Sequence, residues 1–144
     1  MKNILIVLVL SLVFFACKKA EKCVPDSTVI ESLNYEITDS TSIVEDDATL
    51  AELGAKIKTL SESKTCSNEG DWIFIGFGSK ACGGVIGYLP FSTCINTNDF
   101  VNKVNVHAEL QRAYNVKYEV VSICDVPPPP TSVECVNDKP VLVY

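Results

Sequence analysis

The chain has 144 residues, of which 12 are Lys or Arg and 18 are Asp or Glu, so its formal net charge at pH 7 is −6. Nucleic acids and anionic membrane surfaces are bound through clustered Lys and Arg side chains, so an acidic chain is a poor candidate for either partner. The length is sufficient for one domain with a modest hydrophobic core.

Residues 1–16 are typical of an export signal. Lys2 is followed by an unbroken apolar run and then by the small residue Ala16, which is the order of a secretory signal peptide. The run is shorter than the roughly 20 apolar residues that a membrane-spanning helix needs. Because Cys17 follows Ala16, the segment resembles a bacterial lipoprotein signal, in the loosened form found in Bacteroidota. The resemblance implies cleavage before Cys17 and acylation of that cysteine. Plain secretion and an uncleaved anchor are the alternatives.

This address predicts a protein of the bacterial cell envelope, anchored in the outer membrane by lipid on Cys17 and facing the periplasm or the cell surface. Residues 17–28 are expected to form a lipidated tether, and residues 29–144 a single domain. The expected partner besides the membrane is an envelope or extracellular protein. Neither a nucleic acid nor a cofactor is expected.

The chain contains seven cysteines. If Cys17 carries lipid, an even number remains, which in a small exported domain predicts a disulfide framework. These cysteines are Cys23, Cys66, Cys82, Cys94, Cys124 and Cys135. We favour a bridge from Cys124 to either Cys135 or Cys82 and leave that choice open. Zinc ligands usually come in close C-x-x-C pairs with histidines, and this spacing predicts no metal site.

In the first half of the chain, weak alternation over residues 29–37 predicts a strand. Residues 38–47 read as a loop leading into a helix, with Asp46 and Asp47 at its solvated start. From Thr49 to Ser61 apolar residues recur at three- and four-residue spacing, which predicts an amphipathic helix.

In the second half, residues 72–78 and 85–91 read as two strands joined by a glycine-rich turn. Asn98 is the expected N-cap of a second helix. Its apolar face is predicted to hold Phe100, Val104, His107, Leu110 and Tyr114. Alternation predicts a strand over residues 117–124, and a terminal hairpin is expected to turn at Asn137-Asp138. The predicted class is therefore α+β, with a small, largely antiparallel sheet of about five strands, two helices and disulfide staples.

Two features invite a catalytic interpretation, and neither supports one. The glycines around Lys80 lack the spacing of a phosphate-binding loop and fit a tight turn between strands. His107 is the single histidine, and its place on an apolar helix face favours packing over a role as general base. No catalytic residue is predicted.

The segment between Cys124 and Cys135 is the best candidate for a binding surface. Pro127, Pro128, Pro129 and Pro130 stiffen it. Rigid loops lose little entropy on binding, which favours recognition. The alternative is a stiff connection between two strands.

The block GFGSKACGGVIGYLPFS, the later NVKYEVVSIC and the proline stretch are similar to a group of small exported bacterial proteins of unassigned function that carry a K-A-C-G-G turn. The resemblance spans residues 66–144 and implies a fold and a disulfide pattern. The chain departs from the group at Trp72 and Pro140, where cysteines are expected. One bridge of the group is then missing, and Cys23 with Cys94 would supply another.

The leading functional hypothesis is a small binding or interaction module with an unknown ligand. An envelope hydrolase that uses His107 or carboxylates, and an inhibitor of a hydrolase that acts through residues 124–135, are the alternatives.

Overall fold

The computed structural model describes residue 23 and residues 30–144. The signal segment, Cys17 and most of the expected tether lie outside the described residues. Helix α1 (Ile43–Ser61) and a short 3-10 turn (Glu69–Asp71) precede strands β1 (Trp72–Phe77) and β2 (Gly87–Ser92). Helix α2 (Thr97–Lys117) follows, and strands β3 (Ser132–Val136) and β4 (Lys139–Val143) end the chain.

The four strands form two separate antiparallel hairpins, β1–β2 and β3–β4. The class is α+β, as predicted, but the expected sheet of about five strands is wrong. Residues 30–37 and residues 120–124 belong to no strand. Alternation alone does not make a strand, because each strand also needs a neighbour for its backbone hydrogen bonds.

Helix α1 begins six residues before the expected Thr49. The cause is a capping box: the Ser42 hydroxyl accepts from the backbone of Glu45, and the Glu45 carboxylate accepts from the Ser42 N–H at 2.8 Å. The Ser42 N–H and the Ser42 hydroxyl, which also donates to the Glu45 carboxylate at 2.8 Å, hold the pKa of Glu45 below its usual value. Helix α2 is likewise capped by Asn96 rather than by Asn98, through a bond from the Asp99 N–H.

Asp46 was expected to be solvated and is instead fully buried. Its carboxylate accepts hydrogen bonds from Lys117 Nζ at 2.7 Å and from the Tyr118 hydroxyl at 2.8 Å. Burial opposes the charge, but the bonds from Lys117, Thr41 and Tyr118 prevail and lower the pKa of Asp46. This buried pair joins the start of α1 to the end of α2.

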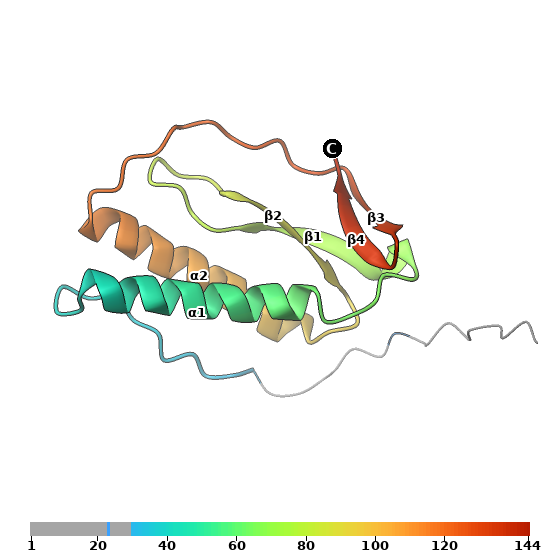
Figure 1. Ribbon diagram of the computed structural model, residues 1–144, viewed down its shortest axis with the longest axis horizontal. Coiled ribbons are helices and arrows are strands. Elements are labelled where there is room, and N and C mark those ends of the chain that lie inside the picture. The colour runs from blue at the N-terminus through green and yellow to red at the C-terminus, as the bar shows by residue number, and fades with distance from the viewer. Residues whose placement is uncertain (1–22, 24–29) are drawn as a thin grey trace, which may run out of the picture.

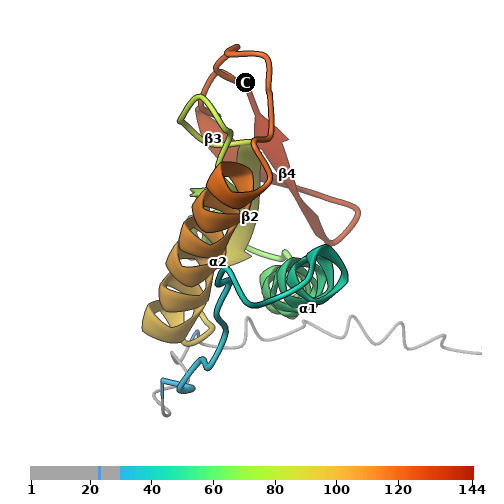
Figure 2. The same cartoon turned by 90° about the vertical axis from the view of Figure 1, so that its left-hand side faces the viewer.

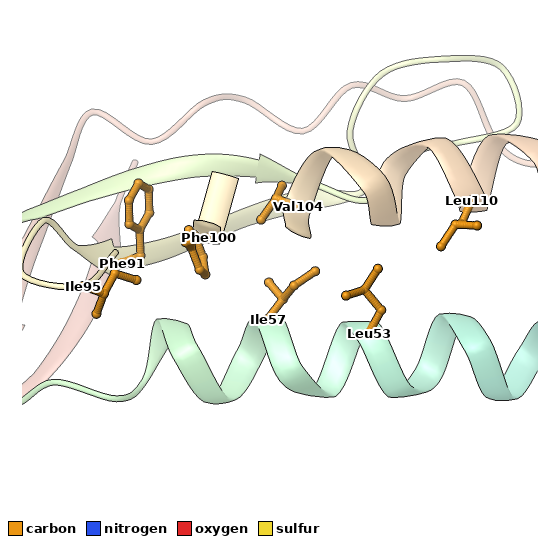
Figure 3. Packing of buried hydrophobic residues seen from close by; sticks show 7 residues of the cluster. All are labelled: Leu53, Ile57, Phe91, Ile95, Phe100, Val104 and Leu110. Carbon is orange, nitrogen blue, oxygen red and sulfur yellow. The ribbon is translucent and has the colours of Figure 1, made fainter. Parts of the chain in front are cut away.

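The main core lies between the helices and the β1–β2 hairpin (Figure 3). Its buried members are Leu53, Ile57, Phe91, Ile95, Phe100, Val104 and Leu110. A smaller cluster of Cys66, Trp72 and Val133 packs the β3–β4 hairpin against the start of β1. Figure 2, in which α1 is seen nearly end-on, shows both helices on one side of β1–β2.

The terminal hairpin forms as predicted, with Asn137 and Asp138 at its turn. Both have positive φ, 52° and 63°, which matches the twist that a two-residue hairpin needs and which Asn and Asp tolerate best among non-glycine residues.

Candidate functional site: the strap and the β1–β2 turn

The connection from α2 to β3 contains an extended segment without helix or strand, residues 120–130, which we call the strap. In Figure 1 it leaves the end of α2, passes the turn between β1 and β2, and runs along the side of the molecule opposite α1. It therefore lies next to the glycine-rich turn that the sequence singled out.

The β1–β2 turn is a built structure. The Lys80 N–H donates to the Gly84 carbonyl at 3.0 Å, and the Gly83 N–H donates back to the Lys80 carbonyl at 3.0 Å. Gly83 and Gly84 have φ of 93° and 81°, a region that side chains rarely adopt. The predicted tight turn between two strands is confirmed. Gln111 and Asn115 of α2 bond to the backbone of Ser79 and fix the turn to the helix.

Lys80 ties the strap to this turn. Its ammonium group donates to the Asp125 carbonyl at 2.6 Å and forms an ion pair with the Asp125 carboxylate. The Lys80 cation holds the pKa of Asp125 below its usual range, although desolvation of the carboxylate acts in the opposite direction. The middle of the strap is thus held at one point.

The strap exposes apolar side chains. Val121 is 93 % exposed, Ile123 77 % and Val126 75 %. Within the part of the chain that the structure describes, the N–H groups of residues 121–124 donate no backbone hydrogen bond. Contact with another polypeptide would bury these apolar side chains and give hydrogen-bond partners to these amides, and both effects favour such a contact.

The predicted proline surface is only partly accessible. Pro128 and Pro129 are exposed and Pro127 is half-buried, but Pro130 is buried and offers no contact surface. The apolar exposure instead precedes the prolines, at positions where alternation predicted a strand. That alternation was the available signal, but it was assigned to sheet pairing inside the domain.

A groove of about 520 Å³ lies beside the strap, between the turn and α2. Val116 and Val120 border it where the helix passes into the strap, and Lys80 and Arg112 add positive charge to its lining. Its volume falls within the range of about 300–1,000 Å³ that is typical of ligand pockets.

His107 lies away from this surface and is 6 % exposed. Its ring stacks on Phe77 with centroids 4.7 Å apart. Burial lowers the pKa of His107, and the neighbouring backbone of Leu50 acts in the opposite direction. A general base must reach its substrate, so this position supports the predicted packing role.

The structure contains two disulfides, Cys23–Cys94 and Cys66–Cys135. The first is the pair expected to replace the bridge that the chain lacks at Trp72 and Pro140. The proposed bridge from Cys124 to Cys135 is wrong, because the smaller core cluster brings Cys135 to Cys66.

Cys82 and Cys124 were also predicted to lie in disulfides, but in the structure they are exposed free thiols, one on the turn and one on the strap. Elsewhere, Asp71 lies within 4.8 Å of the sulfur atoms of Cys23 and Cys94. Those sulfurs are joined to each other and offer no thiolate to a metal ion.

Comparison of the chain with known protein families, with curated proteins and with solved structures finds no match. Among the described residues no helix is both long and apolar enough to cross a bilayer. The two disulfides indicate that the domain folds in an oxidising compartment outside the cytoplasm.

Proposed function

We propose that this protein is a lipid-anchored binding module of the bacterial cell envelope, whose strap recognises an extended segment of a partner protein. The observation that carries the proposal is the exposure of Val121, Ile123 and Val126 on a segment in which, within the described chain, the N–H groups of residues 121–124 donate no backbone hydrogen bond. An added strand would satisfy these amides and cover the apolar side chains, which is the usual mode of β-strand addition.

The way the strap is held also favours binding. The Lys80–Asp125 contact fixes its middle, and the prolines restrict its last third. Less conformational entropy is then lost when a partner binds. The groove beside Val120 offers space for one side chain of that partner.

Site-specific photocrosslinking in intact cells tests the strap. A photoreactive amino acid at Val121 should capture one defined envelope protein. The matched control is Ile30, an exposed aliphatic residue (58 %). The neighbouring Glu31 N–H bonds to Asp99 in the first turn of α2, so Ile30 lies at the opposite end of that helix from the strap.

Binding of the captured protein, measured with purified components, should be lost in Val121→Asp and kept in Ile30→Asp. Equal capture at both positions, or equal loss in both variants, would refute recognition by the strap.

Metabolic labelling with palmitate tests the anchor separately. Wild type should incorporate label and sediment with membranes, whereas Cys17→Ser should do neither. Equal labelling of the two proteins, or a mature N-terminus other than residue 17, would contradict lipidation at Cys17.

A further inference from the structure

The two free thiols of the described chain lie against each other. Cys82 Sγ is 3.5 Å from the Ser122 hydroxyl oxygen and 3.8 Å from the Ile123 carbonyl oxygen. Cys124 Sγ is 3.9 Å from the Ser122 carbonyl oxygen, so both sulfur atoms lie against the same residue of the strap. Cysteines separated by 42 positions in sequence are thus brought together by the strap crossing the turn.

Their proximity is maintained by neighbouring residues. Cys82 lies inside the turn closed by the Lys80–Gly84 and Gly83–Lys80 bonds, and Cys124 directly precedes Asp125, the residue that Lys80 holds. One lysine therefore fixes both segments beside the sulfur atoms. Both thiols are open to solvent and to a reactant.

The two sulfurs are electrostatically unlike. Hydrogen bonds from Cys124 and Ser122 lower the pKa of Cys82, and the Lys80 charge acts in the same direction. The bond to Cys82 raises the pKa of Cys124, and desolvation adds to it. Since the thiolate is the nucleophile in disulfide exchange, these opposite shifts favour Cys82 over Cys124 as the attacking thiol.

We propose that Cys82 and Cys124 are a thiol–disulfide exchange site whose oxidised form bonds the strap to the β1–β2 turn. The reactant is a disulfide, RS–SR. The Cys82 thiolate attacks one sulfur of RS–SR, a mixed disulfide Cys82–S–S–R forms, and the first RS⁻ leaves and takes up a proton. The Cys124 thiol loses its proton and attacks the Cys82 sulfur, and the second RS⁻ leaves. Two thiols are oxidised and RS–SR is reduced to two RSH.

This site differs from the two other bridges, which lie in the smaller core cluster and beside the N-terminal segment. Its chemistry does not depend on what the strap binds. Oxidation would fix the strap at a second point, next to Ile123.

The test uses the full-length protein, exported and purified, with oxidised glutathione as RS–SR. Mild reduction should free two thiols, which disappear together on exposure to oxidised glutathione and leave no glutathione attached. Chymotrypsin cleaves after Tyr88 and so separates Cys82 from Cys94. A glutamyl endopeptidase cleaves after Glu134 and so separates Cys124 from Cys135. Mass spectrometry of these peptides should then show a Cys82–Cys124 link.

Single variants assign the roles. Cys124→Ser should retain one glutathione on Cys82. Cys82→Ser should react at Cys124 at least about threefold more slowly than Cys124→Ser reacts at Cys82. Without its partner, the pKa of Cys124 is still raised by desolvation and by Asp125, whereas Ser122 and Lys80 still lower the pKa of Cys82. The double variant Cys82→Ser/Cys124→Ser controls for exchange at the other bridges and should release no thiol under the same mild reduction. Circular dichroism checks that each variant is folded, and Cys124→Ala replaces Cys124→Ser if that variant is not.

The proposal is overturned if wild type retains a glutathione on each cysteine, if the peptides link Cys82 or Cys124 to any other cysteine, or if the pair is reduced only together with the other two bridges. Equal rates for the two single variants would overturn the assignment of Cys82 as the attacking thiol.

Discussion

Replacement of His107 tests whether the single histidine serves to pack the core or takes part in function. The ring is 6 % exposed, stacks on Phe77 at 4.7 Å and lies against Gly54, where a Cβ would be 3.4 Å from its Nε2. His107→Ala removes the ring contact, worth about 0.5–1.5 kcal/mol, and leaves a cavity between the helices. We expect a total loss of about 2 kcal/mol of unfolding free energy, which lowers Tm by about 8 °C for a domain of this size.

The pH dependence of stability gives an independent signature. Burial keeps the pKa of folded His107 below its usual range, whereas the unfolded chain titrates near 6.5. Below about pH 6.5 the unfolded state therefore binds more protons than the folded state. As the pH is lowered from there to the folded pKa, the unfolding free energy decreases by up to about 1.4 kcal/mol per pH unit. His107→Leu fills the site without titrating. It should lose less stability than His107→Ala at pH 7.5 and should lack this part of the acid sensitivity.

Urea unfolding of wild type, His107→Ala and His107→Leu at pH 7.5 and pH 5.5 measures these differences, and capture through Val121 should persist in both variants. Carboxylate titration is common to all three proteins and cancels in the comparison. The packing interpretation fails if His107→Ala unfolds like wild type, or if wild type and His107→Leu show the same change between the two pH values. A variant that keeps its stability but loses partner capture would give the imidazole a functional role.

Two further changes test the fold. Cys66→Ala/Cys135→Ala should lower the unfolding free energy by about 2–4 kcal/mol, because the bridge closes a separation of 69 residues and lies in the smaller core cluster; an unchanged denaturation midpoint would contradict this bridge. Gly76→Ala should cost about 1–3 kcal/mol, because its Cβ would lie 2.6 Å from Val85 Cγ1. Gly87→Ala, which meets nothing within 4 Å on the same hairpin, should be near neutral, and Val85→Ala should rescue Gly76→Ala; equal effects of the two glycine changes would be inconsistent with the close approach.

Local patterns were sufficient where neighbours in sequence decide the structure. The spacing of Leu53 and Ile57 fixed the apolar face of α1, and that of Phe100, Val104 and His107 fixed the face of α2. The residues of the terminal turn are recognisable because their positive φ is a local requirement. The even set of cysteines left after Cys17 indicated an oxidised domain, since redox compartment follows from composition and context.

Tertiary structure decided what depends on a distant partner. Asp46 looks like a solvated helix start until Lys117, 71 positions later, reaches its carboxylate. Residues 120–124 alternate like a strand, but no neighbouring strand accepts their hydrogen bonds, so their apolar side chains remain exposed. The pairing of cysteines is equally non-local: the cluster around Trp72 joins Cys66 to Cys135, and the strap brings Cys124 to Cys82. Sequence spacing carries no information on such contacts, because only the folded chain sets which segments meet.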